Sequence, residues 1–149
     1  MASGQSEEVS TAKFLSKMKS INNDSFLEDA NNFIDRNFQV YLNKLLEQKQ
    51  LSRKDVIKIT DLGDTYGWMI FTGKRKPSRN KILQLCFAMQ LSVVESNRLL
   101  RAGSMSELYP KNQRDAIIIF CLENGYSLSQ ADTKLYENSL ETCFNDADK

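Results

Sequence analysis

The sequence contains no histidine, and this absence excludes the commonest catalytic and metal-binding arrangements. Histidine is the usual general base near neutral pH and the most frequent metal ligand, so Ser-His-Asp triads, Cys-His pairs and His-containing zinc sites are all excluded. The three cysteines, Cys86, Cys121 and Cys143, include no C-x-x-C pair, which argues against a zinc ribbon or a disulfide framework. We therefore expect a protein without catalytic residues, metal or cofactor.

Proline and glycine are also scarce, with two and six residues among 149. This composition suits helices better than a fold with many tight turns. No apolar run approaches the 18 residues of a membrane-spanning helix, and the N-terminus lacks the charged-then-apolar pattern of a secretory signal. These absences predict a cytoplasmic protein with no membrane partner.

Helical spacing of apolar residues runs through most of the chain and predicts an all-α fold. The β-rich run over residues 117–120 lies inside a helical pattern, and the last two helices are expected over residues 112–124 and 127–139. Cys86 and Cys121 fall on apolar faces, where they are expected to be buried. Helix starts are indicated at Ser52, Asp64 and Ser78, and by capping boxes that pair Ser25 with Glu28, Ser92 with Glu95, and Ser127 with Gln130.

Charge is distributed unevenly along the chain. Residues 51–114 hold twelve Lys and Arg against five Asp and Glu, whereas residues 115–149 hold two against seven. A basic segment of this kind is typical of a surface that faces a polyanion, although helical surfaces also carry Lys and Arg without any such role.

The basic segment contains an ordered set of short motifs. It begins at Leu51-Ser52, continues through two short helical stretches over residues 52–59 and 64–72, and then reads Gly-Lys-Arg-Lys-Pro-Ser over residues 73–78. An apolar helix with Ile82, Leu83, Leu85, Ala88 and Met89 follows, and Leu91-Ser92 starts the next helix. Over about residues 41–101 this order resembles the lambda-repressor-like, or Xre, family of helix-turn-helix proteins.

The resemblance implies a bundle of five short helices over residues 35–103. A helical extension would precede it over residues 1–34, and a helical hairpin would follow over residues 104–149. It further implies a small bacterial-type transcriptional regulator, not an enzyme, that binds double-stranded DNA. Members of this family commonly bind as homodimers, so a homodimer is expected here.

The resemblance also assigns roles at a DNA interface. The helix over residues 64–72 would lie in the major groove, supported by the helix over residues 52–59, while Lys74, Arg75 and Lys76 lie along phosphates. Ser78 would add a hydroxyl or a backbone amide at a helix start. The implied DNA-binding residues are Ser52, Arg53, Asp64, Thr65, Trp68, Met69, Lys74, Arg75, Lys76, Ser78 and Arg79.

Several positions depart from the pattern of the family. Arg53 stands where a phosphate-binding Gln is usual, and Asp61 replaces the turn glycine, so Asp61 is expected to hold a left-handed turn. The family usually has a small residue at the position of Ile57 and an aliphatic residue at the position of Gly67, and in this chain the two sizes are reversed. We expect Ile57 to fill the space that the absent side chain of Gly67 leaves.

The base-reading positions support a second hypothesis. Trp68 and Met69 look more like an apolar contact patch than a hydrogen-bonding code. The alternative function is therefore a protein-protein interaction or adaptor module that reuses the helix-turn-helix fold and contacts a protein partner through this face.

The sequence also aligns with itself. Residues 79–100 match residues 114–135 without gaps, including Arg79 with Arg114 and Ser92 with Ser127. This offset of 35 predicts a duplicated helical hairpin whose second copy packs beside the fourth and fifth helices of the bundle. The alternative is that two capped amphipathic helices align this well by chance.

Overall fold

The computed structural model of the chain describes residues 37–144, and the helices found there belong to one compact unit. They are α3 (Asn37–Gln48), α4 (Arg53–Ile59), α5 (Asp64–Phe71), α6 (Arg79–Ala88), α7 (Val93–Ala102), α8 (Gln113–Glu123) and α9 (Leu128–Glu137). No strand forms between residues 37 and 144, which confirms the all-α prediction for this range. The expected extension over residues 1–34 and its Ser25/Glu28 capping box lie outside the described residues.

Local side-chain caps set most helix starts. The hydroxyls of Ser52 and Ser78 accept from the third residue of α4 and of α6, and both capping boxes expected within the described range form, at Ser92 and Ser127. Each cap satisfies a backbone N–H that the helix leaves without a partner. The helix boundaries therefore agree with the sequence patterns to within a residue or two.

The turn between α4 and α5 differs from expectation. Helix α5 begins at Asp64, as predicted, but its N-cap is Gly63, so no side chain caps this helix. The left-handed residue of this turn is also Gly63, with a φ of 81°, and Asp61 has no positive φ. Glycine adopts this conformation without the steric cost that a Cβ brings, which explains why the turn uses residue 63.

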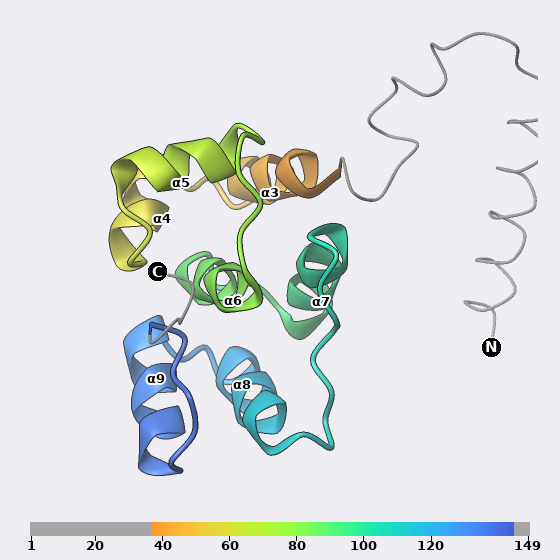
Figure 1. Cartoon of the computed structure of the whole chain (residues 1–149), viewed down its shortest axis with the longest axis vertical. Helices are drawn as coiled ribbons and strands as arrows, with labels where there is room; N and C mark the ends of the chain where they lie inside the picture. Colours follow the sequence, from red (N-terminus) through yellow and green to blue (C-terminus); the bar gives the residue numbers. More distant parts are fainter. Residues whose placement is uncertain (1–36, 145–149) are drawn as a thin grey trace, which may run out of the picture. The chain divides into compact units, whose positions relative to one another are not determined.

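Helix α6 lies at the centre of the described helices (Figure 1), and α4, α7 and α9 pack against it. Its residues from 81 to 88 are all buried, including Lys81 and Gln84. A helix buried on every side needs partners for its polar side chains, because an unpaired buried polar group is costly. The Gln84 amide accepts from the Asp61 N–H at 3.0 Å and donates to the Cys143 carbonyl at 2.8 Å.

The contact between α4 and α5 confirms the expected exchange of side-chain sizes. A Cβ added at Gly67 would lie 2.7 Å from Cδ1 and 2.8 Å from Cγ1 of Ile57, distances that close-packed atoms do not tolerate. Both residues are buried. Ile57 thus occupies the space beside the bare backbone of Gly67, and the two helices pack closely at this point.

The hairpins α6–α7 and α8–α9 have matching backbone conformations at an offset of 35 residues. Gln90 and Gly125, which follow the first helix of each pair, have φ values of 53° and 67°. Ser104 and Ser139, which follow the second helix, have φ values of 62° and 59°. A left-handed residue commonly follows a helix end, and the two hairpins agree in having one at each of these equivalent positions, as the predicted duplication requires.

Side-chain hydrogen bonds repeat at the same offset. Nε of Arg79 donates to the Ser106 carbonyl at 3.2 Å, and Nε of Arg114 donates to the Glu141 carbonyl at 2.7 Å. In each copy, an arginine in the first turn of the first helix thereby holds the segment that follows the second helix.

A second pair of equivalent bonds fixes those segments further along. Oδ1 of Asn97 accepts from the Leu108 N–H at 2.8 Å, and Oδ1 of Asp132 accepts from the Cys143 N–H at 2.7 Å. Leu108 and Cys143 are both buried. In each copy, this bond between a side-chain oxygen and a backbone N–H thus holds the segment that follows the second helix against the core.

The two copies also exchange contacts with each other. Arg79 pairs with Asp115 of the second copy at 3.2 Å, and Arg114 donates to Oδ1 of Asn80 in the first copy at 2.8 Å. Because Asn80 and Asp115 are equivalent positions, the exchange is reciprocal. Helices α8 and α9 also pack on α7 and α6, as the sequence predicted.

The second copy is polar at two positions where the first copy is buried. In α7, which packs against α3, Leu99 and Ala102 are buried. The equivalent residues of α9 are Lys134, which is half-exposed, and Glu137, which is exposed. Terminal units of repeat arrays require such a polar outer face for solubility, and α9 carries one.

The Ile57/Gly67 contact generates a stability prediction. Gly67→Ala is expected to destabilise the fold by about 1 to 3 kcal/mol, because its new methyl overlaps Ile57. In an Ile57→Ala background the same change is expected to stabilise by about 1 kcal/mol, because alanine favours helix over glycine. Urea unfolding of the four proteins measures both values, and an equal loss in the two backgrounds would contradict the proposed contact.

Candidate nucleic-acid interface

The residues assigned to the interface lie mainly on α4, α5 and the loop after α5. Ser52 and Arg53 are exposed at the start of α4, and Asp64, Thr65 and Trp68 are exposed on α5. Met69 is half-buried beside them, and Lys74, Arg75, Lys76, Ser78 and Arg79 follow in the loop and at the start of α6. Of these, Ser52 is already an N-cap, with its hydroxyl accepting from the Asp55 N–H at 3.4 Å.

A hydrogen-bonded cap joins the end of α5 to the basic loop. The Lys74 N–H donates to the Met69 carbonyl at 2.8 Å, and the Gly73 N–H donates to the Ile70 carbonyl at 3.2 Å. With Gly73 at a φ of 80°, these bonds form a Schellman motif. The motif fixes the direction in which the chain leaves α5, and therefore where the basic side chains begin.

Helix α3 holds this cap from the other side. Nδ2 of Asn43 donates to the Phe71 carbonyl at 2.8 Å, which satisfies one of the backbone groups left over at the end of α5. The side chain of Gln39 packs directly against Gly73, leaving no room for a Cβ there. Asn43 and Gln39 were not identified from the sequence, because only the packing of α3 on α5 brings them to this end.

The loop presents three consecutive cations. Lys74, Arg75 and Lys76 are exposed, whereas the next residue, Pro77, is buried and anchors the loop. Nζ of Lys74 lies 5.6 Å from the ring centroid of Trp68, within the range of a cation–π interaction. The basic loop and the exposed face of α5 are therefore one continuous surface.

The exposed face of α5 is unusual in its chemistry. The helix reads DTYGWMIF and carries no Arg, Lys, Asn or Gln, the side chains that recognise a base through two hydrogen bonds. The Thr72 hydroxyl, at the end of the helix, donates back to the Trp68 carbonyl at 2.9 Å. The face is thus defined by Thr65, Trp68 and Met69, and the carboxylate of Asp64 lies at its N-terminal end, where it complements the helix dipole.

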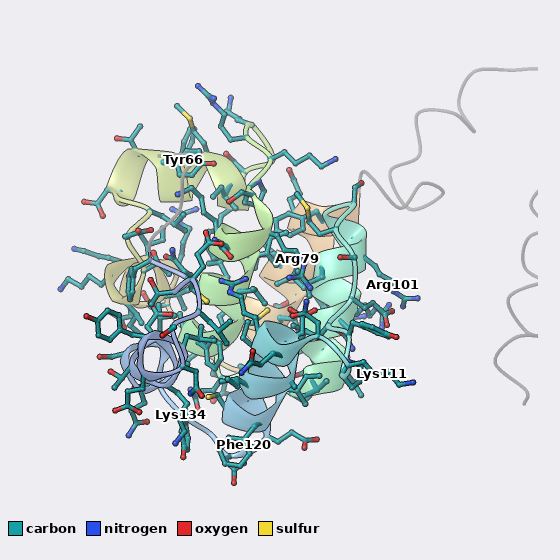
Figure 2. The ribbon with its side chains drawn as sticks, turned by 60° about the horizontal axis from the view of Figure 1, so that its bottom comes forward. Tyr66, Arg79, Arg101, Lys111, Phe120 and Lys134 are labelled. Atoms are coloured by element: carbon teal, nitrogen blue, oxygen red, sulfur yellow. The ribbon has the colours of Figure 1, made fainter. Side chains whose placement is uncertain are left out.

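Arg79 was expected at the interface, but its partly buried guanidinium is engaged by other parts of the fold. Its Nη1 and Nη2 donate to the carboxylate of Asp115 at 3.3 and 3.2 Å, while Nε donates to the Ser106 carbonyl and Nη2 to the Glu107 carbonyl, each at 3.2 Å. Figure 2 labels Arg79 near the middle of the described helices and Tyr66 on α5. Ser78 caps α6 through the Lys81 N–H at 3.4 Å. The structure therefore gives Arg79 a structural role and does not place it with the three loop cations.

The cysteines carry no reactive chemistry. Cys86, Cys121 and Cys143 are buried and free, as expected for the first two. Burial raises the pKa of the Cys86 thiol to about 12, and burial likewise raises the pKa of Cys143, so both remain protonated near neutral pH. Between residues 37 and 144, no three Asp, Glu or Cys side chains gather closely enough to hold a metal ion.

Over the same range, no helix combines the length and the apolar character that crossing a bilayer requires. Comparisons with protein-family models, curated proteins and solved structures return no match for the chain. A function for this chain therefore has to be inferred from its own residues.

The pairing of Arg79 with Asp115 generates a prediction. Arg79→Met is expected to destabilise the fold by about 2 to 4 kcal/mol, because it leaves the carboxylate of Asp115 buried without its cation. Arg75→Met, at an exposed loop position, is expected to change stability by less than about 0.5 kcal/mol. Urea unfolding compares the two variants, and an unchanged midpoint for Arg79→Met would show that the ion pair is dispensable.

Proposed function

We propose that this chain is a small DNA-binding transcriptional regulator in which α3 to α7 form a lambda-repressor-like bundle. Helix α5 would enter the major groove, α4 would support it, and Lys74, Arg75 and Lys76 would contact phosphates. The packed α4–α5 pair, joined through Ile57 and Gly67, supports this arrangement. So does the match between the sequence of the loop and that of the family.

The observation that carries the proposal is the position of the three loop cations. A Schellman motif and two α3 side chains fix the loop at the end of α5, so the charges of Lys74, Arg75 and Lys76 gather at one edge of an exposed helix. Preorganised cations at the edge of a helix suit phosphates, which supply most of the affinity of a protein for duplex DNA.

Removing the loop cations tests the proposal. Alanine at Lys74, Arg75 and Lys76 together is expected to weaken binding to all duplex sequences and to flatten the slope of log affinity against log salt by about 2 to 3. Fluorescence anisotropy of a labelled random duplex at about 50 to 200 mM salt measures both quantities.

A charge-matched control distinguishes an effect of these loop cations from an effect of the lower net charge. Alanine at Arg101, Lys111 and Lys134 removes the same number of cations, and Figure 2 shows these residues on α7, before α8 and on α9. This control is expected to retain the wild-type salt slope much more closely. Equal losses in the two triple variants would contradict the assignment of phosphate contacts to the loop.

The exposure of Trp68 favours protein binding as a second candidate function. Its side chain is 42% exposed next to half-buried Met69, on a face without bidentate base-reading groups. An exposed aromatic beside a methionine is typical of protein interfaces, in which tryptophan often supplies much of the binding energy.

If this second candidate is correct, the wild-type chain is expected to bind no duplex DNA and to retain a protein from lysate that Trp68→Ala loses. Tyr136→Ala removes another exposed aromatic, on α9, and is expected to keep that protein. Quantitative pull-down compares the three chains. An identical set of retained proteins for all three would weigh decisively against an α5 docking surface.

A further inference from the structure

The exposed face of α5 lacks the groups that usually distinguish purines. Of its outward side chains, Asp64 accepts hydrogen bonds only, Thr65 has one hydroxyl, and Trp68 has one indole N–H donor. A single donor finds an acceptor in the major groove on adenine, guanine or thymine alike, so it does not separate these bases. Asp64 can accept a hydrogen bond from a base amino group such as that of cytosine, and further discrimination by this helix has to come from its apolar surface.

The major groove has one apolar feature, the C5 methyl group of thymine. Trp68 offers a large apolar surface to such a methyl, and Thr65 and Met69 flank it one turn before and one residue after. The Thr72 hydroxyl is turned back to the Trp68 carbonyl at 2.9 Å. The Thr72 hydroxyl is thus withdrawn from the C-terminal half of the face, which offers the apolar atoms of Trp68 and Met69 together with one indole N–H.

Lys74 positions the tryptophan for this contact. Its ammonium lies 5.6 Å from the ring centroid, and its backbone N–H is bonded to the Met69 carbonyl at 2.8 Å. A cation at this distance is attracted to the face of the ring. Lys74 therefore links Trp68 to the loop that is proposed to contact phosphates.

We propose that α5 selects DNA through thymine methyl groups that contact Trp68, with Thr65 and Met69 completing the apolar surface. This inference rests on the proposed DNA-binding function. It makes the chain a reader of methyl groups in the major groove, and 5-methylcytosine, which carries a methyl at the same ring position, belongs to the same ligand class.

Exchange of thymidine for deoxyuridine tests the inference, because it removes the methyl and leaves the hydrogen-bonding groups unchanged. We would measure the affinity of the full chain for an alternating A·T duplex and for its deoxyuridine counterpart by fluorescence anisotropy at low salt. The thymine duplex is expected to bind at least about fourfold more tightly, the value of one buried methyl group. A G·C duplex with 5-methylcytosine is expected to bind more tightly than its unmethylated form by a similar factor.

Variants identify the residue responsible. Trp68→Ala is expected to reduce the thymine-to-uracil ratio to about one, whereas Tyr136→Ala, at a side chain that is 78% exposed on α9, is expected to keep the wild-type ratio. The triple alanine variant of Lys74, Arg75 and Lys76 is expected to bind both duplexes more weakly with a smaller change in ratio.

The outcomes separate the two proposals. Equal wild-type affinity for the thymine and uracil duplexes would overturn methyl recognition and leave DNA binding standing. Absence of binding to any duplex would overturn both. A ratio that persists in Trp68→Ala would also overturn the inference, since the methyl preference would then arise from another surface.

Discussion

The burial of α6 on every side is the constraint on which the other helices depend. A fully enclosed helix has no solvent to satisfy its polar side chains, so the Gln84 amide has to find backbone partners. It finds them in two segments far apart in the sequence, the Asp61 N–H and the Cys143 carbonyl. One side chain thereby ties the turn before α5 to the end of the second hairpin, and the orientation of α5 is fixed from within the core.

The duplicated hairpins change how the basic segment is interpreted. Arg79 and Arg114 belong to the basic segment, yet each donates to the backbone that follows the second helix of its own hairpin. Arg79 also pairs with Asp115, and Arg114 donates to Asn80. Lys81 is buried as well, with its ammonium 5.5 Å from the Tyr66 ring centroid. Part of the positive excess is therefore engaged within the fold, whereas the three cations of the loop are exposed, as are Arg53, Lys54, Lys58, Arg101 and Lys111.

The two candidate functions use the same small area and differ in what covers Trp68. Phosphate contact requires only the loop cations, whereas sequence preference or protein docking requires the apolar face of α5. Because the Schellman motif and the α3 side chains Asn43 and Gln39 fix the two parts relative to each other, a change in one is expected to alter the presentation of the other. The proposed recognition of thymine methyl groups uses both parts, because the loop cations would contact phosphates while the apolar face of α5 contacts the bases.

The sequence by itself determined the features that depend on nearby residues. Serine caps, capping boxes and apolar spacing predicted the helix limits, self-alignment predicted the 35-residue repeat, and the resemblance to the helix-turn-helix family implied the Ile57/Gly67 exchange. Tertiary structure alone decided that Arg79 pairs with Asp115 and that Asn43 caps α5. These contacts depend on partners as many as 36 residues away, which no local pattern encodes.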